Sequence, residues 1–313
     1  MNFNPFSRIF FTNVAVVFLI ILVSAGGVRA QSDSLSFLHV TDTHLIFDLE
    51  DYHPGVISKR KHYGNGIVPL KNLLDSIVFT RDIRFVSITG DLVDFCEAST
   101  ENSGMRSFQL ERFCRLIDQY PLPVFLNMGN HDIAAYGWKN DQMTSSQKNA
   151  GMTRAAWIRS AHSFRNGTYY SQALTVGGTD YRLIFLDNGH NSDASARAPY
   201  LDRIQLDWLR EQLAISEKDI EIVFMHIPVA DDKSPSELLE TLVQSPTVKL
   251  VLSGHEHRNH TSWLGSQKRL FQVQTAAFAR NPNEWRRITL TAKSVVISKP
   301  GSRLIEQVIP LDR

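Results

Sequence analysis

Residues 37–44 read FLHVTDTH, in which an apolar, strand-like run (37–40) is followed within four residues by Asp42 and His44. The same order, an apolar run and then polar residues, recurs four times along the chain. The later stretches are FVSITGD (85–91), VFLNMGNHD (124–132), IVFMH (222–226) and LVLSGHEH (250–257). Sites in α/β sheets lie at the carboxyl ends of strands. The pattern therefore predicts that these polar residues meet on one edge of one sheet.

The polar residues at the strand ends are of the types that bind hard or borderline metal ions. They are Asp42, His44, Asp91, Asn130, His226, His255 and His257. Carboxylate oxygen, amide oxygen and imidazole nitrogen suit Zn, Mn or Fe, and the set contains no thiolate. Two cations roughly 3.5–4 Å apart, bridged by one carboxylate, can clamp a phosphate ester for in-line attack by hydroxide. Each motif alone is compatible with an ordinary turn, so the prediction of a two-metal centre rests on the joint pattern.

Two further residues of the third motif are candidates for catalysis. His131 is the motif imidazole that remains after seven ligands are assigned, and such an imidazole is suited to protonate a leaving oxygen. Asp132 follows it directly. Its carboxylate either orients His131 or a ligand through a hydrogen bond or caps the start of a helix. The sequence leaves both alternatives open.

The series Asp-x-His, Gly-Asp, Gly-Asn-His, His and Gly-His-x-His resembles that of the calcineurin-like metallophosphoesterases over roughly residues 36–308. The segment LDRIQLDWLREQL (201–213) also resembles the helix before the lone-His strand in many members. The resemblance implies an α/β fold, a four-layer αββα sandwich of two mixed β-sheets flanked by helices. The alternation of strand-like and helix-like segments agrees with this layered architecture.

The resemblance also implies roles for the candidate residues. Two divalent transition-metal ions (Mn, Fe or Zn) are expected as cofactors. Asp42, His44 and His257 would bind the first ion, Asn130, His226 and His255 the second, and Asp91 would bridge them. His131 would protonate the leaving group or stabilise charge on the phosphoryl group.

The implied activity is hydrolysis of a small phosphate monoester or diester by a hydroxide that bridges the metals. The alternative is a metal-bound scaffold without catalysis. Scaffolds of this family tend to lose a ligand or the proton-donating His, whereas this chain keeps both. Asp94 stands where the purple acid phosphatase branch has a tyrosine that ligates ferric iron, which argues against a purple centre. With His44 retained, the pattern is closest to class III cyclic-nucleotide phosphodiesterases.

The first 30 residues resemble a signal peptide. Arg8 precedes an apolar run (14–23), and the segment ends Val28-Arg29-Ala30, which predicts cleavage before Gln31. The ten-residue run is short for a bilayer span, although an uncleaved anchor is the alternative. We therefore expect one domain, 31–313, that is exported to the periplasm or extracellular space without stable membrane insertion.

The composition is that of a soluble globular protein, with 43% hydrophobic and 21% charged residues among 313. Removing residues 1–30 takes two of the 33 basic residues and none of the 32 acidic ones, which leaves a net charge of −1. Such a charge predicts no nucleic-acid surface. The sequence does not determine the oligomeric state.

Hydrophobic periodicity predicts the remaining elements. Helices are expected over 68–79, 105–119, near 153–162, over 202–213 and over 236–244, with an otherwise irregular stretch over 133–166. A hairpin is expected from strands 169–176 and 181–186, and further strands over 270–274, 287–291 and 295–298.

Several side chains keep two interpretations. Cys96 and Cys114 form either a disulfide or two buried thiols. Trp138 and Trp157 line a substrate wall or pack in the core. His190 is a candidate to line the site. The basic run 59–62 is either a solvated loop or a segment that attracts the phosphate of a substrate.

Overall fold

The computed structural model describes residues 33–80, 82–189, 201–216, 218–229 and 236–311. The expected signal peptide (1–30) and His190 lie outside the described residues. The strands are β1 (Ser34–Val40), β2 (Val86–Thr89), β3 (Glu97–Ser99), β4 (Met105–Arg106), β5 (Val124–Asn127), β6 (Ala135–Lys139), β7 (Gln142–Ser146), β8 (Tyr170–Val176), β9 (Thr179–Phe185), β10 (Ile220–Phe224), β11 (Val248–Ser253), β12 (His260–Leu264), β13 (Leu270–Gln274), β14 (Trp285–Thr291), β15 (Ser294–Ser298) and β16 (Ile305–Pro310). The helices are α1 (Pro54–Arg60), α2 (Ile67–Ile77), α3 (Gln109–Ile117), α4 (Ala150–Ser160), α5 (Arg203–Ile215) and α6 (Glu237–Gln244), with short 3-10 turns at Leu49–Asp51, Lys61–Tyr63 and His162–Phe164.

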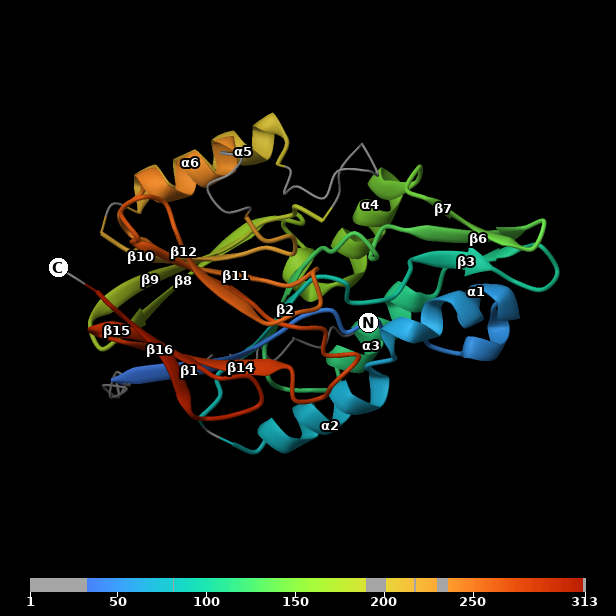
Figure 1. Cartoon of the computed structure of the whole chain (residues 1–313), viewed down its shortest axis with the longest axis horizontal. Helices are drawn as coiled ribbons and strands as arrows, with labels where there is room; N and C mark the ends of the chain where they lie inside the picture. Colours follow the sequence, from blue (N-terminus) through green and yellow to red (C-terminus); the bar gives the residue numbers. More distant parts are fainter. Residues whose placement is uncertain (1–32, 81, 190–200, 217, 230–235, 312–313) are drawn as a thin grey trace, which may run out of the picture. The chain divides into compact units, whose positions relative to one another are not determined.

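Two six-stranded mixed sheets form the centre of the described chain (Figure 1). The first has the order β16-β15-β14-β1-β2-β5, in which β1, β2 and β5 are parallel and β14 runs antiparallel to β1. The second has the order β12-β13-β11-β10-β9-β8, in which β9, β10, β11 and β13 are parallel. The strands that precede candidate ligands are thus parallel to one another within each sheet: β1, β2 and β5 in the first, and β10 and β11 in the second.

Alternation of side chains along the strands produces a layered core. Phe37 of β1 points between the sheets, where its ring lies 5.8 Å from that of Phe224 in β10. Leu38 and Val40 point to the other face, which α2, α3 and α4 cover. The outer face of the second sheet is covered by α5 and α6. The structure therefore confirms the expected α/β fold of mixed sheets flanked by helices.

A polar contact joins the two sheets at the edge where the candidate ligands lie. Asn127, at the end of β5 in the first sheet, donates from Nδ2 to the carbonyls of Leu186 and Phe224, each at 2.9 Å. These carbonyls lie at or just beyond the ends of β9 and β10 in the second sheet. The amide therefore fixes how the strand ends of one sheet face those of the other.

A third, four-stranded sheet in the order β4-β3-β6-β7 was not expected. Its hairpin β6–β7 occupies part of the stretch predicted to be irregular, and Asn140 and Asp141 at its turn have φ angles of 50° and 57°. Two consecutive positive φ angles are typical of type I′ hairpin turns. The helix predicted over 105–119 is also wrong at its start, because Met105 and Arg106 pair with β3 and the helix begins at Gln109.

Most other elements agree with the periodicity. The predicted hairpin is β8–β9, and the helices near 68–79, 202–213 and 236–244 are α2, α5 and α6. The strands β12 and β16 were missed. The disulfide alternative is wrong, since Cys96 and Cys114 are both buried free thiols. No helix within the described ranges has the length and apolar character needed to cross a bilayer.

Candidate metal centre

The seven predicted ligands lie at the carboxyl ends of five strands from two sheets. Asp42 and His44 follow β1, Asp91 follows β2, Asn130 follows β5, His226 follows β10, and His255 and His257 follow β11. The expectation of a single sheet edge is therefore wrong, because β1, β2 and β5 belong to the first sheet and β10 and β11 to the second. Both sheets must keep their mutual position for the ligands to converge.

The first donor group consists of Asp42 Oδ1, His44 Nε2, His257 Nε2 and Asp91 Oδ2. The Nε2 atoms of His44 and His257 are 3.1 Å apart, and Asp42 Oδ1 lies 3.0 Å from His257 Nε2. Asp91 Oδ2 is 3.6 Å from His44 Nε2. These four residues present ligand atoms within 4.8 Å of one another, and a metal ion could occupy the space between them.

The second donor group consists of Asn130 Oδ1, His226 Nε2, His255 Nδ1 and, again, Asp91 Oδ2. Asn130 Oδ1 lies 3.1 Å from both His226 Nε2 and His255 Nδ1, and these two nitrogens are 3.2 Å apart. Asp91 Oδ2 is 3.4 Å from His226 Nε2. One carboxylate oxygen is thus common to both groups, an arrangement that would let Asp91 bridge two cations through a single oxygen.

Hydrogen bonds occupy the carboxylate oxygens that do not face the donor groups. Asp42 Oδ2 accepts from the Thr41 hydroxyl at 2.7 Å and from the His255 amide at 3.0 Å. Asp91 Oδ1 accepts from the His131 amide at 2.9 Å. By contrast, Asp42 Oδ1 is buried without a well-formed hydrogen bond, and His257 Nε2 lies 3.0 Å from it. Because both atoms are metal-ligating types, a cation between them would satisfy this buried carboxylate oxygen.

Two imidazoles are oriented by bonds on the side away from the donor groups. The Nδ1 atom of His44 lies 3.1 Å from Asp94 Oδ1, and that of His226 lies 2.9 Å from the Thr89 carbonyl. A proton on Nδ1 in each bond leaves the Nε2 lone pair facing the centre, which is the usual arrangement of a ligating histidine. The residues present therefore fit a metal centre in donor type and orientation.

The backbone at the ligands adopts a sparsely populated conformation. Positive φ angles occur at Asp42 (53°), His44 (41°), Asp91 (49°), His255 (72°) and His257 (54°). Such residues cost on the order of 1–3 kcal/mol each and cluster at functional sites. Neighbouring glycines make the close approach possible, since a Cβ on Gly254 would overlap Thr41 and one on Gly129 would overlap Asp91.

Electrostatics couples the bridging carboxylate to its neighbours. Burial opposes ionisation of Asp91, but the imidazoles of His226 and His131 outweigh burial and hold the pKa of this carboxyl well below its ordinary value. Burial likewise opposes protonation of His226, yet Asp91 raises its pKa to about 10. A bound metal ion would have to displace the proton from His226, so metal affinity would fall as the pH falls.

His131 faces the centre but is not a member of either donor group. Its Nε2 atom lies 3.9 Å from Asp91 Oδ2, while Nδ1 lies 2.9 Å from the Asp94 carbonyl and 3.0 Å from Arg60 Nη2. Burial lowers the pKa of His131 to about 4, so the imidazole is neutral at neutral pH. A neutral ring whose Nδ1 accepts from Arg60 carries its proton on Nε2 and can donate it to a phosphoryl oxygen, and the imidazolium form would be a strong proton donor.

Asp132 acts on the backbone of the ligand loops rather than on the ring of His131. Its Oδ1 accepts from the Val93 amide at 3.0 Å and its Oδ2 from the Gly129 amide at 2.7 Å. The carboxyl group thereby joins the loop that carries Asp91 to the loop that carries Asn130. No helix begins at Asp132, so the capping alternative is wrong.

Arg60 is a site residue that the sequence did not single out within the basic run 59–62. It is buried, and its Nε and Nη2 atoms donate to the Asp94 oxygens at 2.7 and 2.9 Å. Asp94 thus connects Arg60 to His44, because its Oδ1 also lies 3.1 Å from His44 Nδ1. Lys59 and Lys61 remain exposed, so the run is divided between the site and the surface.

Tyr63 is a second residue that the sequence analysis missed. Its ring centroid lies 4.9 Å from that of His44, 5.1 Å from that of His257 and 5.6 Å from that of His131. The half-buried ring therefore forms a wall beside the first donor group. The exposed Arg280 lies 5.5 Å from the same ring. No sequence pattern connects Tyr63 to the motifs, because the contact depends on the fold of 61–64.

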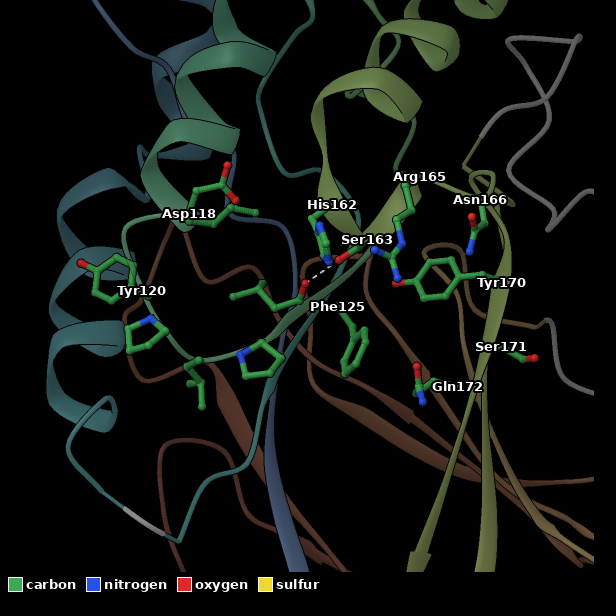
Figure 2. A pocket seen from close by; sticks show the side chains of 15 residues that line it. Asp118, Tyr120, Phe125, His162, Ser163, Arg165, Asn166, Tyr170, Ser171 and Gln172 are labelled. Atoms are coloured by element: carbon green, nitrogen blue, oxygen red, sulfur yellow. Dashed lines mark hydrogen bonds between the residues drawn. The ribbon is translucent and has the colours of Figure 1, made fainter. Parts of the chain in front are cut away.

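The two tryptophans do not lie at the centre. Trp157 is fully buried in the core, where its indole nitrogen donates to the Asp132 carbonyl at 3.0 Å, and Trp138 stacks on His53 at 5.0 Å. A separate cavity of about 410 Å³ lies near the start of β5 and β8 and is lined by Asp118, His162 and Arg165 among others (Figure 2). It contains none of the predicted ligands, so the candidate chemistry is not located there.

The fold and the convergent donors define an α/β sandwich protein with a candidate metal centre between its sheets. A model of the calcineurin-like phosphoesterases matches residues 35–259. The chain therefore belongs to the calcineurin-like phosphoesterase family, as the resemblance predicted.

Solved structures support the fold at low sequence identity. The chain is similar to a dimetal phosphatase from Danio rerio, with 15% identity, a TM-score of 0.61, and coverage of 89% of this chain and 99% of that one. It is also similar to GAP50, the anchor in the inner membrane complex of Plasmodium, with 12% identity, a TM-score of 0.55 and 90% coverage of each chain. No curated protein matches the sequence.

Proposed function

We propose that this protein is a metal-dependent hydrolase of phosphate esters whose centre takes two divalent transition-metal ions. The observation that carries the proposal is the pair of donor groups that share Asp91 Oδ2. Their oxygen and nitrogen donors suit Mn, Fe or Zn. When bound, two such ions would polarise a phosphoryl oxygen and lower the pKa of a water molecule so that it attacks phosphorus.

The protein side chains hold and complement this chemistry. Asp91 Oδ2 is common to both donor groups, and Asp42, His44 and His257 complete the first group. The Nε2 atom of His131 faces the shared oxygen from 3.9 Å, where it can donate to the phosphoryl group or to the leaving oxygen. Tyr63 limits the space beside the first group and would contact the ester group of a bound substrate.

The alternative is a catalytically inactive, metal-bound scaffold. The similarity to GAP50, the anchor in the inner membrane complex of Plasmodium, concerns the fold and carries no assignment of this role. The position of His131 supports the enzyme instead, because protonation of a leaving group uses this imidazole, whereas a scaffold that only binds metal does not need it.

Turnover of nitrophenyl phosphate esters tests the proposal. We expect the demetallated protein to be inactive and added Mn²⁺ to restore hydrolysis, with the Asp91→Ala variant as the background control. Comparing bis-nitrophenyl phosphate with nitrophenyl phosphate separates a diesterase from a monoesterase. Full activity after rigorous removal of metal, or none with two metals bound, contradicts the proposed function.

We also propose that the protein is exported, to the periplasm or outside the cell, and acts on small phosphate esters rather than nucleic acid. The support is the signal-like segment 1–30 and the net charge of −1 that remains after its removal.

A further inference from the structure

In the loop after β10, the amides of His226 and Ile227 and the Ile227 carbonyl form their hydrogen bonds with a side chain and not with a neighbouring strand. Asn188, just beyond β9, supplies the missing partners from its side chain. Its Oδ1 accepts from the amides of His226 at 2.9 Å and Ile227 at 3.1 Å, and its Nδ2 donates to the Ile227 carbonyl at 2.8 Å. Asn188 is fully buried. All three bonds of this amide therefore hold the two-residue segment that begins with a ligand.

These bonds determine where the imidazole of His226 is placed. Asn188 accepts from the amides on both sides of the His226 α-carbon, and the His226 carbonyl accepts from the Gly254 amide at 2.9 Å. The ring is turned by the bond between Nδ1 and the Thr89 carbonyl. Position and orientation are thus set by different residues. The result is the 3.1 Å approach of His226 Nε2 to Asn130 Oδ1 within the second donor group.

Gly189, the residue after Asn188, lies against the loop of the first sheet that carries Asn130, another member of the second donor group. A Cβ on Gly189 would overlap the backbone of Met128 and Gly129, directly before Asn130. The chain at 188–189 therefore lies against both loops that supply the second donor group. In the described part of the chain, no hydrogen bond joins Asn188 to Asp42, His44 or His257 of the first group.

We propose that Asn188 is a positioning residue for the second metal ion and determines its affinity without affecting the first. The proposal rests on the proposed function, in which the centre takes two cations. Asn188 touches neither cation nor substrate and acts through the backbone of His226. Loss of groups that orient ligands typically lowers metal affinity by 10–100-fold, and we expect a loss of this size at the second site alone.

The chain offers a matched control in the same loop. Gln272 of β13 binds Val229 with the same chemistry, because its Oε1 accepts from the Val229 amide at 2.7 Å and its Nε2 donates to the carbonyl at 3.0 Å. It is also buried, but it holds the loop three residues beyond the ligand. Removing Gln272 therefore loosens the loop without releasing the peptide groups of His226.

The experiment is titration of the demetallated full-length protein with Mn²⁺, with bound metal counted by mass spectrometry and two dissociation constants fitted. For Asn188→Leu we expect an unchanged first constant and a second constant weakened about 10–100-fold. Gln272→Leu should lower the melting temperature but leave both constants unchanged.

Three results would overturn the inference. One is Asn188→Leu with two wild-type constants, and another is an equal loss at both sites. The third is a loss in Gln272→Leu that matches that of Asn188→Leu, since it would indicate general loosening of the loop. If Asn188→Leu does not fold, Asn188→Ser carries the test, because its hydroxyl is too short to reach both amides. Wild-type protein that binds a single ion would refute the two-cation centre itself. Failure of the proposed function can therefore be distinguished from failure of the inference about Asn188.

Discussion

Replacing Arg60 by Met tests whether the buried ion pair behind the first donor group supports the fold. Arg60 and Asp94 are 5% and 0% exposed, and two hydrogen bonds of 2.7 and 2.9 Å join them. Methionine is unbranched and can occupy part of the space between the rings of Tyr63 and Tyr136, which lie 4.3 and 4.7 Å from the guanidinium carbon. In the variant, Asp94 retains the bond with His44 but loses both donors of the guanidinium.

Removing one partner of a buried ion pair destabilises a protein by about 3–5 kcal/mol, because the other charge stays buried without compensation. Domains unfold with about 5–15 kcal/mol in total. We therefore expect Arg60→Met to lose a large share of its unfolding free energy at pH 7. Urea unfolding of the metal-free protein, followed by circular dichroism, measures the difference without a contribution from bound metal.

The ion pair also predicts how the loss depends on pH. Burial opposes ionisation of Asp94, but the bonds from Arg60 and His44 hold its pKa below the ordinary value. Since the pKa is lower in the folded chain than in the unfolded chain, this stabilisation is fully present above pH about 4 and is lost as the pH falls further. The difference between wild type and variant should therefore shrink in acid.

Two controls define the test. Lys59→Met alters the exposed neighbour and should change stability by less than about 0.5 kcal/mol. The double variant Arg60→Met with Asp94→Leu should recover part of the loss, because no unpaired charge remains buried. An Arg60→Met variant within about 1 kcal/mol of wild type, as for a surface pair, would refute the reasoning.

Three further predictions concern the centre and the export of the chain. Asp91→Ala should be the most damaging single change, because it removes the only oxygen common to both donor groups; two bound ions and unchanged turnover in that variant would show that Asp91 does not bridge. His131→Ala should keep both metals and lower kcat by about 10²–10⁴-fold for an alkyl ester, with a smaller loss for a nitrophenyl ester whose leaving group needs no proton. Equal losses on both substrates would indicate that His131 stabilises phosphoryl charge instead. Mass spectrometry of the exported protein should find a chain that begins at Gln31, whereas a full-length chain retained in the membrane would favour an uncleaved anchor.

The sequence by itself determined the ligand types, their order and the fold class. Apolar runs followed by Asp42, Asp91 or His226 are local signals, because a strand and the residue after it lie within one short segment. The missed hairpin at 135–146 was also a local signal, since the pair Asn140-Asp141 favours a type I′ turn.

The tertiary structure alone decided which residues stand behind the ligands. Arg60 and Asp94 are 34 residues apart, Asn188 and His226 are 38 apart, and none of these pairs follows a periodic pattern. The same limit explains why the ligands were expected on one sheet. The strand ends look alike in sequence, so their sequence does not indicate which sheet each strand joins. That division depends on tertiary packing, in which Phe37 and Phe224 pack between the two sheets. Side-chain contacts over such separations depend on the packing of the whole domain, which no short segment encodes.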